Sequence, residues 1–324
     1  MNNQLAKTEL QKSSSWLAQF RTFDLVAILT LALSIYLTFE SQNFFQFLIL
    51  LQLLVVSIAW PAFRRSCHLW LTVVLLWVPT LYYEWCNHED HVYFAIYWCA
   101  VLGLATWRPA VVVAGKLRQR SDSKEWHRDT EKFIRVSARW LIGLCFLFAF
   151  AWKLASPEFR DGSLFQYKLT CDNRFSETLA IYPGGMDVPT LLVNYEKMHE
   201  LRSPAAQVTA QPLQYTDRIS WMSHAMTWWT ILIEGLLAVA FLWPAGRRVN
   251  LVRNASLILF ALSTYVIAPV MGYGFAFMIL GFANTESHER KTRWTYFGAL
   301  IILLLILLYR DNFVPPDIKE AVTA

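Results

Sequence analysis

The chain has 324 residues, of which 56% are hydrophobic, 15% aromatic and only 16% charged. This composition is too apolar for a soluble domain of this length and excludes a sizeable soluble catalytic domain. The formal net charge of +5 would suit nucleic acid in a soluble protein. The basic residues here stand between apolar runs, so they indicate membrane topology and no nucleic-acid partner.

Residues 1–22 precede the first apolar run. They contain Lys7, Lys12 and Arg21 and lack both the compact apolar stretch and the cleavage site of a signal peptide. Their Leu, Trp and Phe residues are compatible with an interfacial helix. We interpret this segment as a cytoplasmic lead-in.

Nine apolar runs follow, and a hydrocarbon core of about 30 Å requires about 20 residues per helix. The runs are approximately Leu25–Phe39, Phe44–Trp60, Leu69–Tyr83, Val92–Gly115, Trp140–Ala155, Met222–Trp243, Leu257–Ile267, Val270–Ala283 and Trp294–Tyr309. Pro269 separates the seventh run from the eighth, so these two are either one kinked helix or two spans. We predict an all-α integral membrane protein: one domain, residues 23–310, forming a bundle of eight or nine transmembrane helices, then a tail of residues 311–324.

The charges of the connections predict which side each one faces. The basic connections are Arg64 with Arg65, the stretch from Lys116 to Lys132, and Arg247 with Arg248 and Arg253. The positive-inside rule places them in the cytoplasm together with the N-terminus. We therefore expect residues 156–220 to form one long external loop, ordered as a lid, and expect a bacterial inner membrane as the location.

The five cysteines show no metal-ligand spacing, and we expect no metal. Cys86 and Cys171 both fall on the predicted outer side, where an oxidising periplasm permits a disulfide. A bridge between them is a hypothesis, because two cysteines on one side need not be close enough to pair.

Three ionisable residues lie within or at the ends of apolar runs: His91, Lys153 and Glu234. Charge at such depth costs roughly 2.5–3.5 kcal/mol on insertion scales, so it marks either a site or a paired structural contact. The structural alternatives are a lysine that snorkels to the interface, a histidine in a polar loop, and a buried carboxyl bonded to a neighbouring helix.

The predicted topology brings His91 and Lys153 to similar depth, because His91 begins an inward-going helix and Lys153 ends the outward-going helix that follows. We predict that both converge on one outward-facing cavity beneath the lid, with Glu234 deeper along it. Phe146 shares the helical face of Lys153, and Trp98 that of His91. These residues predict an apolar wall suited to a quinone ring or an acyl chain.

The segment from Phe146 to Gly162 contains Trp152-Lys153-Leu154, then Pro157 and Asp161. It resembles the lysine motif of the vitamin K-dependent γ-carboxylase family, which includes the bacterial horizontally transferred transmembrane domain (HTTM) proteins. Asp90-His91-Val92-Tyr93 resembles the family's motif that opens a span, and Ile233-Glu234-Gly235 resembles its acidic span. Three motifs in the family's order carry the resemblance.

The resemblance implies that Lys153 is the base that deprotonates a reduced quinone of the menaquinone or vitamin K type, that His91 supports it, and that Glu234 organises the cavity. A partly dehydrated lysine is easier to deprotonate than one in water, which suits this role. The residues implied to bind quinone or substrate are Tyr93, Trp98, Phe146, Trp152 and Asp161. The partners implied are membrane lipid, a quinone, and a peptide or small-molecule substrate.

The chain departs from the family pattern at Phe150, where the family has a glycine, and at Arg108-Pro109-Ala110. Three functions therefore stay open. The first is a quinone-linked enzyme with carboxylase-like chemistry. The second is a non-catalytic membrane protein of the same fold that binds lipid or quinone or serves as a scaffold. The third is a small-solute carrier in which Glu234 titrates, against which the absence of repeated halves counts.

Overall fold

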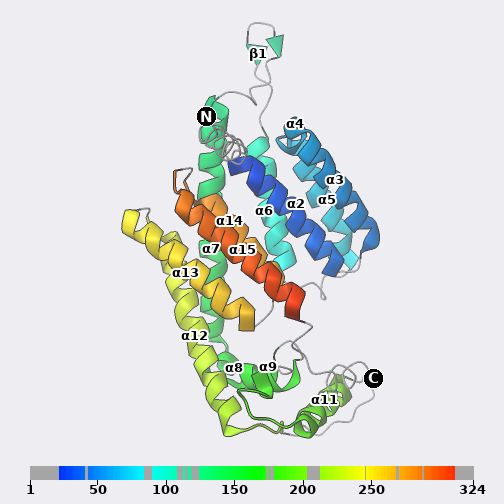
Figure 1. The fold of residues 1–324 in the computed structure, drawn as a ribbon, viewed down its shortest axis with the longest axis vertical. Helices are drawn as coiled ribbons and strands as arrows, with labels where there is room; N and C mark the ends of the chain where they lie inside the picture. The colour runs from blue at the N-terminus through cyan, green and yellow to red at the C-terminus, as the bar shows by residue number, and fades with distance from the viewer. Residues whose placement is uncertain are drawn as a thin grey trace, which may run out of the picture. The chain divides into compact units, whose positions relative to one another are not determined.

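The computed structural model describes residues 22–40, 43–83, 90–107, 112–113, 116–117, 124–172, 175, 179–202, 212–244, 246–267, 270–286 and 288–310. Apart from turns and one antiparallel pair of two-residue strands, β1 (Val112–Val113) and β2 (Lys116–Leu117), the ordered elements in these ranges are helices (Figure 1). The all-α prediction is confirmed for this part of the chain. The predicted lead-in, apart from Thr22, and the predicted tail lie outside it.

The chain forms two compact units. One contains residues 1–141 and 275–297, and the other contains residues 142–274 and 298–324. Three helices therefore contribute residues to both units: α7 (Lys124–Ala155), α14 (Met271–Asn284) and α15 (Arg290–Arg310). The division shows which residues pack together within each unit. It does not test the predicted single transmembrane domain, which stays a prediction.

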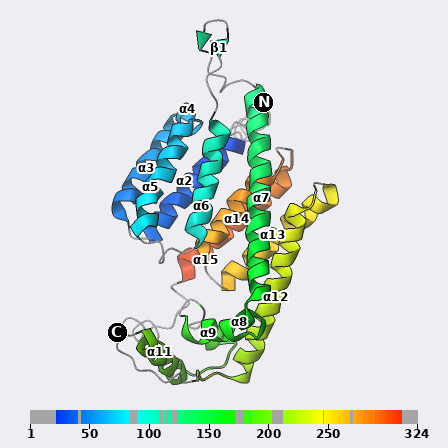
Figure 2. The ribbon, with the colours of Figure 1, turned by 180° about the vertical axis from the view of Figure 1, so that it is seen from behind.

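The first unit contains a group of four long helices. In it α2 packs against α3 and α6, and α5 packs against α6, so the four lie side by side (Figures 1 and 2). Its elements before α7 are α2 (Thr22–Glu40), α3 (Phe44–Ala59), α4 (Pro61–Arg64), α5 (Cys67–Tyr83) and α6 (Asp90–Thr106).

A buried charge cluster ties the start of α2 to the turn between α3 and α5. Arg64 Nε donates to Asp24 Oδ1 and Arg65 Nη2 donates to Asp24 Oδ2, each at 2.8 Å. Arg64 also donates to the Ser57 carbonyl oxygen at 2.8 Å. Asp24 thus neutralises one of two arginines at a connection that the sequence predicts to be cytoplasmic.

The second unit joins the end of α7, from Ile142, to α12 and α13 and to the helices between α7 and α12. Here α12 packs against α8, α9 and α13, and α11 packs against α9. The new elements are α8 (Pro157–Arg160), α9 (Ser163–Cys171), α11 (Val188–Arg202), α12 (Asp217–Leu242) and α13 (Arg247–Ile267). The described part of residues 156–220 therefore contains α8, α9, α11 and the start of α12, and its external position stays a prediction.

A hydrophobic core orders this segment. Its buried members come from α9, α11, the start of α12 and the turns between them: Leu169, Phe175, Ala180, Met186, Leu191 and Ile219. Asn194 closes the segment by accepting from the Gln214 amide at 3.0 Å and donating to its carbonyl at 2.7 Å. Cys171 lies in this segment, whereas Cys86 lies outside the described residues, so the predicted bridge stays untested.

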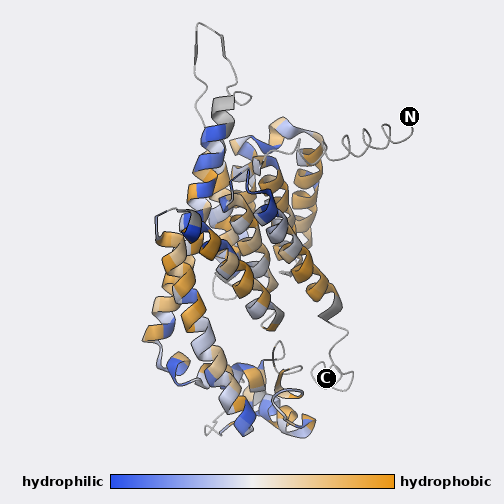
Figure 3. Cartoon of the chain, turned by 60° about the vertical axis from the view of Figure 1, so that its left-hand side comes forward, coloured by the Kyte–Doolittle hydropathy of each residue, from blue (hydrophilic) through white to orange (hydrophobic). Residues whose placement is uncertain are grey.

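Among the described residues, four helices are long and apolar enough to cross a membrane, and four shorter helices are also apolar. Figure 3 shows apolar residues along most of the long helices. The four longer stretches are Thr22–Phe39, Arg128–Ala155, Asp217–Leu242 and Arg290–Leu308. This part of the chain is therefore helical with several helices able to span a bilayer, and the predicted count of eight or nine remains a prediction.

Two details of the predicted runs differ in the structure. The fourth run, Val92–Gly115, was too long: α6 ends at Thr106, and Val112 lies in β1. Pro109 gives the physical reason, because proline lacks the amide proton a helix needs and disfavours helical backbone at the residue before it. The seventh and eighth runs are two separate helices, α13 and α14.

Arg253 does not belong to an exposed basic connection as the sequence suggested. It is only 2% exposed, and its guanidinium donates to the carbonyl oxygens of Ala240 and Trp243 and to Asn250 Oδ1. The last carbonyls of a helix have no partner within that helix. Arg253 on α13 therefore caps the end of α12 and fixes the α12–α13 turn.

Candidate functional site

The structure brings two of the predicted site residues together across 81 positions of sequence. Lys153 lies in the last turn of α7, and Glu234 lies in the second half of α12. The Lys153 ammonium donates to Glu234 Oε1 in an ion pair whose side chains are 13% and 7% exposed. Lys153 therefore does not snorkel to an interface, because its charge is held by a buried carboxylate.

An aromatic cluster covers the lysine side of this ion pair. The Lys153 Nζ atom lies 5.1 Å from the centre of the Phe159 ring, which α8 supplies and which is itself buried. Phe159 packs edge-to-face with Trp152 and with Phe165, at centroid distances of 5.4 and 5.6 Å. A cation over an aromatic face is stabilised electrostatically, and the rings also exclude water from the pair.

The second carboxylate oxygen of Glu234, Oε2, is the atom of the ion pair that is left to bind a ligand. Oε2 is buried and has no hydrogen-bond partner among the described residues. A buried carboxylate oxygen without a partner is costly, so this atom is where a bound hydroxyl or water would be stabilised. The pair can thus accept a proton at Oε2 while Lys153 holds Oε1.

Two other predicted residues of the second unit differ in exposure. Phe146 is buried and packs edge-to-face against Phe260 of α13 at 4.9 Å, so it belongs to the packing between helices. Trp152 is 60% exposed, although one face of it packs on Phe159.

Asp161 lies in the turn between α8 and α9 and is exposed. The Ser163 amide donates to Asp161 Oδ1 at 2.9 Å and, with the Ser163 hydroxyl, holds the pKa of this carboxyl below its usual range. Asp161 is therefore ionised near neutral pH and is not part of the buried ion pair.

The remaining three predicted residues lie in the first unit, on α6. His91 and Trp98 are buried and Tyr93 is half-buried. The Trp98 indole donates to Thr30 Oγ1 of α2 at 3.0 Å, a contact that fixes two helices. Because His91 and Lys153 belong to different units, their predicted convergence stays a prediction.

An apolar groove lies on the same two helices as the ion pair. Its volume is about 580 Å³, within the range of about 300–1,000 Å³ typical of ligand sites. It is lined from α7 by Leu147 and Phe150, and from α12 and the turn after it by Ile231, Leu232, Gly235, Leu236, Ala238, Val239, Leu242, Trp243 and Pro244. A Cβ at Gly235 would lie 2.9 Å from Phe150 Cε2, so glycine permits the close approach here.

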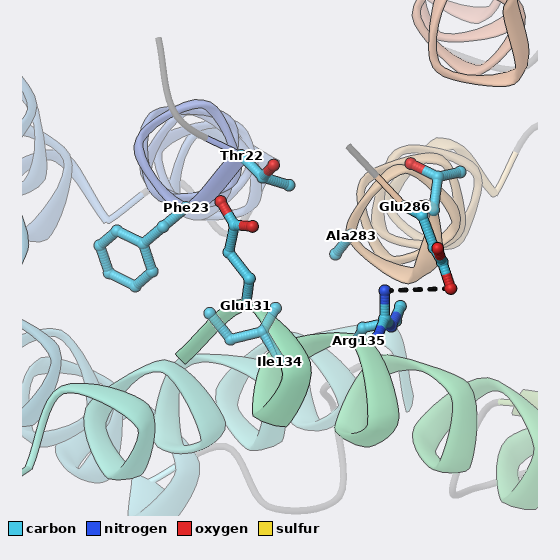
Figure 4. Close-up of a pocket in the computed structure, with 8 residues that line it drawn as sticks. Thr22, Phe23, Glu131, Ile134, Arg135, Ala283 and Glu286 are labelled. Atoms are coloured by element: carbon cyan, nitrogen blue, oxygen red, sulfur yellow. Dashed lines mark ion pairs between the residues drawn. The ribbon is translucent and has the colours of Figure 1, made fainter. Parts of the chain in front are cut away.

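A small polar cavity lies in the first unit, between the start of α2, α7 and the turn after α14 (Figure 4). Glu131 and Arg135 reach into it from α7, and Arg135 pairs with Glu286 at 3.3 Å. Its volume of about 70 Å³ holds a few water molecules and is too small for a quinone. We assign it a structural role, joining α7 to the α14–α15 turn.

Sequence patterns alone did not identify the residues whose roles depend on tertiary contacts. Phe159 lies within the lysine motif, but nothing in its spacing indicates the contact with Lys153. Gly235 likewise lies within the acidic-span motif, and nothing in that motif indicates its close approach to Phe150. The groove and the capping role of Arg253 had no local signal, because each depends on which helices pack together.

No family model matches this sequence, and no curated protein or solved structure matches the chain. Among the described residues, no three His, Cys, Asp or Glu side chains gather as a metal site requires. The class defined by the fold and the site is therefore an all-α protein with membrane-length helices and a buried lysine–glutamate pair beside an apolar groove.

Proposed function

We propose that this protein is a membrane-embedded, quinone-linked enzyme with chemistry like that of the vitamin K-dependent γ-carboxylases. The observation that carries the proposal is the buried Lys153–Glu234 ion pair on the two helices that form the apolar groove. A lipid-soluble hydroquinone needs both an apolar surface for its tail and a proton acceptor for its hydroxyl.

The residues present fit such a group. The groove is apolar along its lining, which suits an isoprenoid chain, and Phe150 of the groove lies one helical turn before Lys153. Gly235 of the groove directly follows Glu234. The ion pair and the groove therefore share the same two helices, although Leu232, Leu236 and Val239 of the groove lie on the face of α12 opposite to Glu234.

When bound, a reduced quinone supplies a weakly acidic hydroxyl and two reducing electrons. Glu234 accepts the hydroxyl proton at Oε2, while Lys153 holds Oε1 and keeps the carboxylate in place. Because the two groups share one hydrogen bond, they titrate as a coupled unit, and the base is the pair. The Phe159 cluster excludes water, which strengthens the electrostatic interactions around the pair.

The proposed setting is a bacterial inner membrane, crossed eight or nine times, with a cytoplasmic N-terminus. The basic connections support this orientation through the positive-inside rule. His91 is proposed to assist from α6, and Tyr93 with Trp152 and Asp161 to contact quinone or substrate at the outer side. Carboxylation or a related step on a peptide or small molecule is the reaction that a bound reduced quinone would support.

A second candidate is a non-catalytic protein that binds lipid or quinone. The groove favours it, because Leu232, Leu236 and Val239 are exposed along it and suit an acyl chain without further chemistry. The two candidates share a ligand class and differ only in whether the ion pair takes a proton.

Turnover of a reduced menaquinone by the purified protein in nanodiscs tests the proposal. We expect oxygen-dependent oxidation of the quinol by the wild type and at least a tenfold loss in Lys153→Ala. Glu234→Gln should also fail, because an amide cannot accept the hydroxyl proton that the carboxylate takes. Lys168→Ala is the matched control, since Lys168 pairs with Asp172 at 2.8 Å at the surface of α9.

The outcomes of this experiment distinguish the enzyme from the non-catalytic binding protein. Binding of the quinol without turnover supports the non-catalytic candidate and overturns the enzyme. Turnover retained in Lys153→Ala removes the pair as the base. Neither binding nor turnover in the wild type overturns both.

A further inference from the structure

One face of α12 carries hydroxyl groups that lead from its outer end to Glu234. Ser223, Thr227, Thr230 and Glu234 are spaced at i, i+4, i+7 and i+11. At 3.6 residues per turn these four side chains fall within about 60° of one another around the helix axis. The opposite face carries the exposed groove residues Leu232, Leu236 and Val239.

The hydroxyl face is buried, and two of its atoms have no partner among the described residues. Ser223 and Thr227 are fully buried, and Thr230 and Glu234 are 8% and 5% exposed. Thr227 Oγ1 and Glu234 Oε2 are the two atoms without a partner. In contrast, Ser223 and Thr230 donate to the carbonyls of Ser220 and Thr227 at 2.7 and 2.9 Å, and their oxygens keep acceptor capacity.

The first turns of α12 on this face lie against the solvent-exposed turn between α8 and α9. Gly162 has φ +81°, and a Cβ at this position would lie 3.0 Å from His224 Nδ1 and 3.3 Å from Ser223 Oγ. The α8–α9 turn therefore lies directly on Ser223 and His224. His224 and Asp161, the residue before Gly162, are both exposed.

We propose that the buried face of α12 binds a file of water molecules that carries protons between Glu234 and the outer end of the helix. The rise from Thr227 to Glu234 is about 10 Å, too far for a direct hydrogen bond and suited to two or three bridging waters. Buried polar atoms without a protein partner are where ordered water is found.

Proton transfer along this path needs no co-reactant, because each group gives up one proton for each proton that it receives. A proton leaves Glu234 Oε2 for the nearest water, each water or hydroxyl passes on one O–H proton as it receives another, and the last water releases one proton to bulk solvent beside the exposed α8–α9 turn. The titratable groups facing Glu234 from neighbouring elements are Lys153 on α7 and Tyr265 on α13. The proposal uses the proposed function only for the source of the proton.

Proton uptake by Glu234 after a rapid pH drop measures the path directly. The infrared band of the protonated carboxyl, assigned by its loss in Glu234→Gln, reports the rate in nanodiscs. We expect Thr227→Val, which keeps the side-chain volume and removes the hydroxyl, to slow uptake at least tenfold. Thr227→Ser should stay within twofold of the wild type.

Thr106→Val is the control, because Thr106 is a buried helical threonine whose hydroxyl donates to the Leu102 carbonyl at 2.9 Å. It should leave the rate unchanged. Ser223→Ala provides a second test should Thr227→Val fold poorly, with an expected slowing of at least threefold. Wild-type rates in both Thr227→Val and Ser223→Ala would overturn the path. This readout requires no quinone, so its failure leaves the hydroquinone proposal standing.

Discussion

At the residue scale, the Lys153–Glu234 pair is the feature with the largest energetic consequence. Two charges removed from water cost several kcal/mol each, and this cost is recovered only while both partners remain. The carboxylate and the ammonium share one hydrogen bond, and the Phe159 ring covers the ammonium. Loss of one partner is therefore worse than loss of both.

A double-mutant cycle tests this asymmetry through thermal unfolding in nanodiscs. We expect Lys153→Met and Glu234→Gln each to destabilise the protein, by about 3–5 kcal/mol where a buried charge is left unpaired. The double variant should be less destabilised than either single variant, because no unpaired buried charge remains in it.

The surface pair Lys168–Asp172 provides the comparison for that cycle, because the Lys168 side chain is 30% exposed. Its coupling should be no more than about 1 kcal/mol. Strict additivity at Lys153 and Glu234 would show that the two side chains do not interact in the membrane.

At the element scale, close packing between α14 and α15 depends on a glycine. A Cβ at Gly281 would overlap the ring of Tyr296, which is itself buried. Backbones approach closely in membrane proteins where small residues face a neighbouring helix. Gly281 thus sets the separation between these two helices.

Substitution of this glycine should separate its packing role from helix propensity. We expect Gly281→Ala to lower the midpoint of thermal unfolding, because the Tyr296 ring must move and overpacking costs about 1–3 kcal/mol. Gly298→Ala on α15 is the control, since its Cβ would meet no atom within 4 Å. That change should be neutral or raise stability by up to about 1 kcal/mol through helix propensity. Equal effects at the two positions would contradict the packing role.

The helix α12 has a buried polar face and an exposed apolar face. Its buried face carries Ser223, Thr227 and Glu234, whereas its exposed face carries the apolar groove residues. A helix with polar side chains inside and apolar side chains outside reverses the order of a soluble protein, and suits a lipid surround with a hydrated interior.

At the scale of the whole molecule, the proposed topology places α8 outside and the start of α13 inside. Single cysteines at the exposed positions Glu158 and Arg248 test it in a background without the native cysteines. We expect a membrane-impermeant thiol reagent to label position 158 in intact cells and position 248 only after lysis. The reverse pattern, or labelling of both in intact cells, would overturn the orientation.

What the sequence determined by itself is the helical class and the position of the apolar helices, whereas α8, α9, α11 and the polar first half of α7 were not predicted. All nine predicted apolar runs coincide with helices, with the fourth ending early at Thr106. This part was predictable because the length and polarity of a membrane helix depend on some 20 consecutive residues. The cost of burying charge likewise drew attention to Lys153 and Glu234 before any fold was known.

Only the tertiary structure decided which buried groups meet. Arg253 looked like one more basic residue of a connection, yet it caps α12. Asp24 stands just before the first apolar run and drew no attention, yet it pairs with two arginines about 40 positions away. Hydrophobic periodicity shows which face of a helix is buried, but it does not identify the helix on the other side. Contacts such as Lys153–Glu234 depend on how α7 and α12 pack, and that packing is set by side-chain shapes along both helices together.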